Sequence, residues 1–131
     1  MELFRRTNPP SLSKPTGYTH VVEVIQGKTV YIAGQVSFDA SGTLVGKGDF
    51  AAQTRQVMEN LKAALAAAGA TFANVVKVNT YVTDLSQIAV LREMRAAYYG
   101  SNPPASTLVQ VVGLAHPDLM IEIEAIAVVP Q

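Results

Sequence analysis

Two segments with the residue spacing of amphipathic helices constrain what this chain can fold into. In residues 49–69 apolar side chains recur every three or four positions, at Phe50, Val57, Met58, Leu61, Leu65 and Ala68. Residues 84–100 repeat the pattern at Leu85, Ile88, Leu91, Met94 and Tyr98. Asp49 and Asp84 stand where N-caps belong, and Gly69 and Gly100 follow the last helical residues. Each segment therefore predicts a helix with one apolar face that must be covered.

Apolar, β-branched segments surround the two predicted helices. Tyr18–Ile25 and Thr29–Val36 flank the turn "QGK" and predict a hairpin, and residues 74–83 predict a third strand. Residues 103–129 predict two more strands, which the turn-rich "GLAHPD" separates. Before the hairpin, the prolines at positions 9, 10 and 15 predict an extended lead-in over residues 1–16.

The predicted order is β-β-α-β-α-β-β, an α+β fold in a single domain over residues 1–131. Two helices cover only one face of a sheet of five or six strands, so the other face meets solvent or another subunit. Strands that are apolar on both faces favour another subunit. With 49% apolar and only 15% charged residues, the chain has enough apolar material for a core, and its low charge also favours oligomerisation.

Composition and missing motifs exclude several kinds of function. Ten basic and ten acidic residues cancel, which argues against nucleic acid as a partner. The chain has no cysteine, and its two histidines, His20 and His116, lack the spacing of a zinc site. Neither a GxSxG elbow nor a phosphate-binding glycine loop is present. We therefore expect no metal and no cofactor. Because no apolar stretch reaches the length of a membrane span, we also expect a cytoplasmic protein without membrane contact.

Two carboxylates interrupt the most apolar part of the chain, in the segment "IEIEAIAVV". Strand alternation puts Glu122 and Glu124 on one face together with Met120 and Ile126. The opposite face is uniformly apolar, with Ile121, Ile123, Ala125 and Ala127, and should face the helices. The acids are then expected on the face that the helices leave open.

The order of several motifs resembles the Rid family (reactive intermediate deaminase, also called YjgF). These motifs are "VYIAGQV", "AAQTRQVMENLKAALAAAGATFANVVKVNTYVTDL", "YYG…NPPAST" and the terminal "IEIEAIAV", which together extend from about Tyr18 to Val129. The resemblance implies a chorismate-mutase-like fold and a homotrimer whose sheets line a central barrel. It also implies three intersubunit clefts that bind a small-molecule ligand. In the better-known members, these clefts hydrolyse enamines and imines derived from amino acids to keto acids and ammonia, without metal or cofactor.

The resemblance also assigns roles to residues of this chain. Glu122 corresponds to a cleft acid that helps hold the hydrolytic water, and the alternative is a carboxylate that only satisfies donors across the subunit interface. Tyr18 corresponds to a cleft tyrosine, although it could equally be an aromatic residue that packs on the proline-rich arm. A backbone carbonyl near Thr107 or Leu108 would hold the water from the other side.

Four positions depart from the deaminase pattern. Ser106 stands where deaminases have an arginine that binds the substrate carboxylate through two hydrogen bonds. Leu108 stands where cysteine is frequent in the deaminases, and Arg92 falls at an asparagine position. Ala33, which precedes Gly34, replaces a serine. Loss of the arginine weakens binding of small anions unless another cation replaces it. Arg92 is the nearest candidate, and a solvated helix residue paired with a neighbouring acid is the alternative. Arg5 and Arg6 are further candidates.

Two functions of different classes follow from these residues. The first is hydrolysis of imines or enamines with an altered substrate preference, and the second is a non-catalytic trimer that binds a small metabolite or partner protein in the same cleft. Some members of the family are described as ribonucleases, but neutral charge and the lack of a histidine acid–base pair argue against that activity here.

Overall fold

The computed structural model describes residues 2–131 and has an α+β fold. Its helices are α1 (Phe50–Ala67) and α2 (Ile88–Tyr99), each accompanied by a short 3-10 turn, η1 (Phe72–Asn74) and η2 (Leu85–Gln87). Its strands are β1 (Phe4–Thr7), β2 (Val21–Val24), β3 (Lys28–Gln35), β4 (Val75–Val82), β5 (Ala105–Gln110) and β6 (Ile121–Val129). The prediction of two helices combined with a sheet is confirmed.

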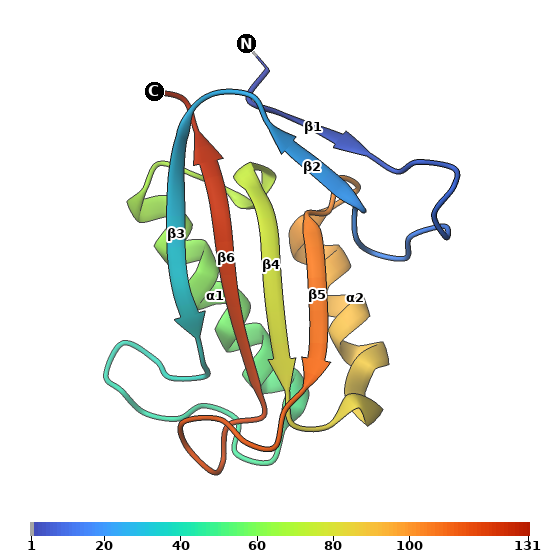
Figure 1. The fold of residues 1–131 in the computed structure, drawn as a ribbon. Helices are drawn as coiled ribbons and strands as arrows, with labels where there is room; N and C mark the ends of the chain where they lie inside the picture. Colours follow the sequence, from blue (N-terminus) through green and yellow to red (C-terminus); the bar gives the residue numbers. More distant parts are fainter. Residues whose placement is uncertain (1) are drawn as a thin grey trace.

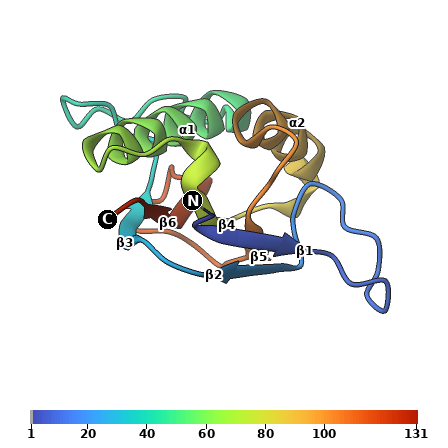
Figure 2. The ribbon, with the colours of Figure 1, turned by 90° about the horizontal axis from the view of Figure 1, so that it is seen from above.

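Four strands form the main sheet in the order β3-β6-β4-β5. β4 and β5 are parallel and α2 connects them, whereas β6 is antiparallel to both β3 and β4. Both helices lie on the same side of this sheet, which leaves the opposite face without a helical cover (Figures 1 and 2). The described part of the chain contains no helix of the length and apolarity that a membrane crossing requires.

The first helix follows its sequence signals closely. The Asp49 carboxylate accepts a hydrogen bond from the backbone N–H of Ala52 at 3.0 Å, and Gly69 has a φ of 72° just beyond the end of α1. The buried side chains of α1 include Val57, Met58, Leu61 and Leu65, which form the centre of the core. The predicted helix over residues 49–69 is thus confirmed.

The second helix differs from its prediction at both its start and its buried face. Asp84 caps the 3-10 turn η2 by accepting a bond from the N–H of Ser86, and α2 itself begins only at Ile88. The buried side chains of α2 are Leu91, Arg95 and Tyr99, so the buried stripe includes an arginine where the apolar pattern pointed to Met94 and Tyr98. Leu85 is exposed, because the 3-10 turn takes it off the helical stripe.

The alternation of the last strand is confirmed. Ile121, Ile123 and Ala127 are fully buried under the helices, and Ala125 is 3% exposed. Glu122 and Glu124 are half-buried on the open face of the sheet. Their strand partners on β4, Tyr81 and Asn79, share that face.

The predicted hairpin between residues 18–25 and 29–36 is wrong. β2 begins at Val21 and pairs with β1, while β3 pairs with β6, so the main sheet has four strands instead of five or six. Gly27, with a φ of 111°, turns the chain at a point where a Cβ would collide with the backbone of Val129. The carbonyl oxygen of Leu3 accepts hydrogen bonds from the N–H groups of Ile25 and Gln26, which extends the β1–β2 pairing to this turn.

Residues 1–16 are also more structured than an extended lead-in, because residues 4–7 form β1. Pro9, Pro10 and Pro15 all follow this strand and therefore do not interrupt its ladder. In Figure 1 the β1–β2 pair lies obliquely beyond the ends of β4 and β5. Just before β2, Thr19 is held by the loop that precedes β5: its hydroxyl donates to the carbonyl of Pro103 at 2.5 Å, and its N–H donates to the carbonyl of Pro104 at 3.1 Å.

Candidate functional site

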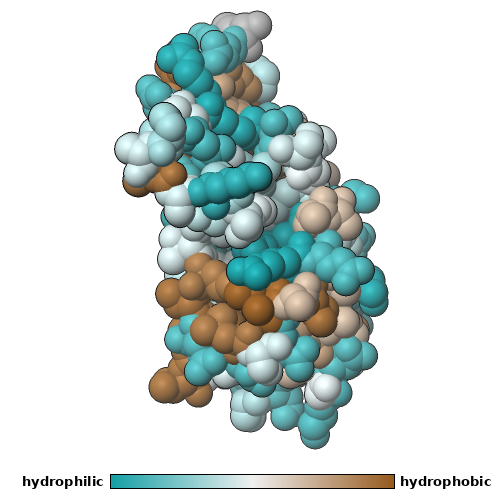
Figure 3. Space-filling model, turned by 90° about the vertical axis from the view of Figure 1, so that its right-hand side faces the viewer, coloured by the Kyte–Doolittle hydropathy of each residue, from teal (hydrophilic) through white to brown (hydrophobic). Residues whose placement is uncertain are grey.

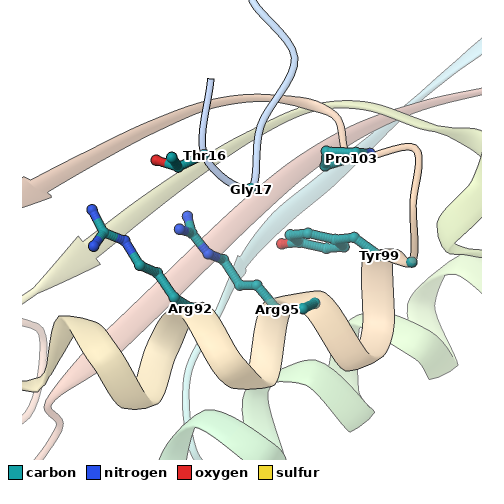
Figure 4. Close-up of a pocket in the computed structure, with 8 residues that line it drawn as sticks. Thr16, Gly17, Arg92, Arg95, Tyr99 and Pro103 are labelled. Carbon is teal, nitrogen blue, oxygen red and sulfur yellow. The ribbon is translucent and has the colours of Figure 1, made fainter. Parts of the chain in front are cut away.

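A pocket of about 280 Å³ opens between α2 and the segment that leads into β2. One wall consists of α2 side chains and the other of the Thr16–Gly17 turn, which the bonds of Thr19 to Pro103 and Pro104 keep in place. The full lining is Thr16, Gly17, Arg92, Arg95, Ala96, Tyr99, Gly100 and Pro103. Figure 4 shows Arg92 and Arg95 rising from the helix toward the turn.

Arg95 is the unusual residue of this pocket. Its side chain is only 6% exposed, and its Nε is buried with no hydrogen-bond partner among residues 2–131. Its Nη1 approaches Ser106 Oγ at 3.5 Å, the outer limit of a hydrogen bond. Burial lowers the pKa of Arg95; Tyr99 offsets part of this effect, and the neighbouring charge of Arg92 adds to it. No carboxylate in the described chain forms an ion pair with Arg95 or Arg92.

Tyr99 adds a second buried polar group to the same pocket. It is 7% exposed, its ring packs against Phe72 with centroids 5.8 Å apart, and its hydroxyl has no partner within residues 2–131. Burial raises the pKa of Tyr99. In Figure 4 this hydroxyl points along the helix toward Arg95. Buried polar atoms without partners are rare in folded proteins, so two of them at one pocket mark it as a candidate binding site.

Strand parity explains why Ser106 meets Arg95. Ser106 pairs with Val78 and Leu108 pairs with Thr80, and both of these β4 residues are buried on the helix side of the sheet. Leu108 accordingly packs against the hydrophobic core. Thr107 lies between them on the opposite face, where its hydroxyl accepts a bond from Lys77 Nζ at 2.9 Å. The predicted site residues of β5 are thus divided between the two faces.

The open face holds the two carboxylates of β6 in different environments. Glu124 Oε1 accepts bonds from Asn79 Nδ2 at 3.0 Å and from the hydroxyl of Tyr81 at 2.8 Å. The bond to Glu124 raises the pKa of Tyr81. Glu122 has no such partner within residues 2–131, and its carboxylate lies directly over Gly34. A Cβ at position 34 would overlap this carboxylate, so a larger residue there would have to displace the Glu122 side chain.

Two other predicted residues line hollows of their own. Ala33 lines a shallow hollow on the open face together with Lys77, Asn79 and Glu124. Tyr18 is half-buried, its ring packs edge-on against His20 with centroids 5.1 Å apart, and it lines a hollow that borders the arginine pocket at Gly17, Gly100 and Pro103. Ala33 therefore lies on the face of the two carboxylates, whereas Tyr18 lies beside the arginine pocket.

One chain brings the predicted residues into two groups. Arg92 lines the α2 pocket, and Ser106 lies next to it through its contact with Arg95, whereas Glu122, Gly34 and Thr107 lie on the open face of the sheet. Arg95 was not predicted, although its position four residues after Leu91 and four before Tyr99 puts it on one helical stripe. No cluster of three potential metal-binding side chains occurs in the described residues.

Comparison with known proteins gives consistent matches over most of the chain. The family model described as endoribonuclease L-PSP matches residues 11–129. A RutC family protein of Pyrococcus horikoshii is 43% identical over 115 residues, which are 87% of this chain and 89% of that protein. The human 2-iminobutanoate/2-iminopropanoate deaminase is 35% identical over 105 residues, 80% of this chain and 76% of that enzyme.

A solved structure matches nearly the whole chain. The Rid-family protein YyfB of Yersinia pestis, whose function is described as unknown, has a TM-score of 0.93 and 43% identity. The match covers 98% of this chain and 100% of that one, so it necessarily includes most of the β1–β2 region as well as the main sheet.

Proposed function

The chain belongs to the Rid family, also called YjgF, and we propose that it hydrolyses reactive imines or enamines to a carbonyl product and ammonia, with a substrate preference that differs from that of the arginine-containing deaminases. The observation that supports this proposal is the free carboxylate of Glu122. It stands on the central strand β6 over Gly34, with no hydrogen-bond partner in residues 2–131 to occupy it. A carboxylate held in this way is available to bind and activate a water molecule.

The proposed reaction needs one general acid–base group. The imine reacts in its protonated form. Glu122 accepts a proton from water as the water oxygen attacks the imine carbon and the C=N electron pair moves to nitrogen, which gives a neutral amino alcohol. The protonated Glu122 then gives its proton to the amino nitrogen and makes it a leaving group. Glu122 accepts the hydroxyl proton as the C=O bond forms, the C–N bond breaks and ammonia leaves, and this last proton passes to solvent. A backbone carbonyl near Thr107 or Leu108 would orient the water.

We propose that the active assembly is a homotrimer in which the open sheet faces line a central barrel. Tyr31, on the open face, is 79% exposed, and Val24 is 50% exposed on β2. Figure 3, viewed from the edge formed by β5 and α2, shows a further apolar area, and Leu85, Val109 and Val112 are the exposed large apolar residues of this edge. Exposed apolar areas of this kind are typical of subunit contacts. Sedimentation equilibrium tests the assembly, and a stable monomer at working concentration would contradict it.

A non-catalytic trimer that binds a small metabolite is the second candidate. Ser106 and Ala33 favour it, because they replace an arginine and a serine of the deaminase pattern. The two candidates differ in whether bound ligand is turned over.

A panel of imines distinguishes the candidates. An amino-acid oxidase generates imino acids in situ from a series of amino acids, and the rate of imine decay and ammonia release is compared with and without this protein. Cyclic or uncharged imines extend the panel beyond amino-acid substrates. Accelerated release for at least one imine is the expected result. If no imine decays faster while ligands still bind, the protein is a binding module and the enzymatic proposal fails.

A further inference from the structure

The pocket on α2 contains two arginines and no acid to balance them. Arg92 and Arg95 lie three residues apart on the same helix, both line the pocket, and neither forms an ion pair within residues 2–131. Like charges at this spacing repel, and burial of an unpaired guanidinium is unfavourable. An anion bound in the pocket would neutralise these charges and offset both unfavourable effects.

We propose that this pocket is a carboxylate-binding site in which Arg95, on α2, supplies the cation that β5 lacks at Ser106. The ligand class is a small monocarboxylate with a short apolar body. Binding itself is independent of the proposed deaminase activity, and the two are linked only if the ligand is the imino acid substrate or its keto acid product.

The contact between Arg95 and Ser106 supports this assignment over the predicted role of Arg92. Arg95 Nη1 lies 3.5 Å from Ser106 Oγ, so one guanidinium nitrogen lies against the side chain at position 106. A side chain as long as arginine at position 106 would compete for that space. The short serine and the buried Arg95 therefore form a compatible pair, whereas Arg92 is exposed at the rim.

The walls of the pocket favour a carboxylate over a phosphate. Ala96, Pro103 and the ring of Tyr99 offer apolar surface, and the volume of about 280 Å³ suits a ligand of a few carbon atoms. The pocket lies at the last turn of α2, where the helix dipole is negative and where backbone N–H groups are not free. The negative end of the helix dipole disfavours a phosphate dianion more than a singly charged carboxylate. A planar carboxylate also fits the two parallel N–H donors of one guanidinium.

The direct test uses butanoate and its uncharged isostere butanamide as probes, with binding followed by calorimetry on the intact protein. Butanoate should bind and butanamide should not. Arg95→Gln should weaken butanoate binding by about 30-fold or more, because the charge-assisted contact is lost. Arg92→Gln should weaken it by only about threefold, as expected for an exposed charge. Arg55→Gln, an exposed arginine on α1, is the matched control and should bind butanoate like the unmodified protein.

Thermal unfolding separates a ligand-binding arginine from a structural one. Removal of a buried unpaired charge by Arg95→Met should leave the melting temperature unchanged or raise it, and butanoate should stabilise the unmodified protein but not this variant. If Arg95→Met instead lowers the melting temperature and disrupts the oligomer, a carboxylate of a neighbouring copy occupies the pocket and the proposal fails.

Three further outcomes bear on the proposal. Butanoate binding that is unaffected by Arg95→Gln overturns it, and inorganic phosphate that binds more tightly than butanoate overturns the ligand class. Arg95-dependent butanoate binding in a protein that hydrolyses no imine supports the site while refuting only the deaminase function.

Discussion

The charged side chains on the two faces of the main sheet differ in sign and in burial. On the helix side, Arg95 is a cation that is 6% exposed and has no acid beside it. On the open side, Glu124 is fixed by two donors, and Glu122 stands unpaired over Gly34. The cation is thus enclosed by its own chain, whereas the acids lie on a surface that has no cover within residues 2–131.

This difference separates binding from chemistry. Because successive strand residues point to opposite faces, Ser106 meets Arg95 while Glu122 faces away from both. One chain therefore holds an anion pocket on one side of the sheet and a candidate acid–base group on the other. We infer that a complete hydrolytic site combines Arg95 of one chain with Glu122 of another, so loss of Arg95 should weaken both binding and turnover, whereas loss of Glu122 should mainly reduce turnover.

The largest expected effect is that of Glu122→Gln on turnover. The amide keeps the shape of the side chain but cannot accept the proton from water, so the rate of imine hydrolysis should fall by about 100-fold or more. Butanoate should still bind, since Arg95, which supplies its counter-charge, is unchanged. Steady-state kinetics and calorimetry on the same preparation provide the two readouts.

Glu124→Gln is the matched control for this substitution. It changes the same side-chain type on the same strand and face, but at an acid already engaged by Asn79 and Tyr81. Turnover should fall by less than about tenfold. The loss of about 100-fold or more that is typical of a general acid–base group is expected only at Glu122. Equal losses for both variants would refute the distinction between the two acids.

A smaller effect is expected from Gly34→Ala. The added methyl group would overlap the Glu122 carboxylate and displace it, which should lower turnover by about tenfold while costing roughly 1 kcal/mol of unfolding free energy. Denaturant titration measures the stability, and the imine assay measures the rate. A variant that retains full activity would show that the position of Glu122 over Gly34 is not required.

Which side chains of β6 face the helices could be predicted from the sequence, because the alternation of a strand is a local pattern. The apolar set with Ile121 and Ile123 identifies the helix side without knowledge of any distant residue, and the Asp49 cap of α1 is similarly local. The β1–β2 pairing was missed because a strand's partner depends on long-range contacts, here the turn at Gly27 against Val129.

Arg95 was missed for a different reason. A search for an apolar stripe assigns buried helix positions to apolar residues, so an arginine between Leu91 and Tyr99 was passed over in favour of Met94 and Tyr98. Only the packing of α2 against Ser106 and the Thr16–Gly17 turn shows that the guanidinium is enclosed. Functional residues that break a local pattern are the ones that pattern-based reasoning finds last.

The smallest expected effect concerns Tyr81 on the open face. Its hydroxyl donates to Glu124, and this bond raises the pKa of Tyr81. In Glu124→Gln the acceptor carries no charge, so the pKa of Tyr81 should move down toward the ordinary tyrosine value. NMR of ring-labelled tyrosine as a function of pH measures the change. An unchanged Tyr81 titration would show that the two side chains do not interact in solution.

The central claim, that Arg95 of one chain and Glu122 of another complete one site, is tested most directly by subunit complementation. Arg95→Gln and Glu122→Gln chains, each expected to be nearly inactive alone, are co-expressed with different tags and purified through both tags, so that every assembly contains both kinds of chain. In the proposed trimer, each mixed assembly has one interface that joins an intact Arg95 to an intact Glu122, and about one third of the unmodified activity should return. If the mixed trimers remain inactive although they assemble, the two residues do not act across an interface and the account is wrong.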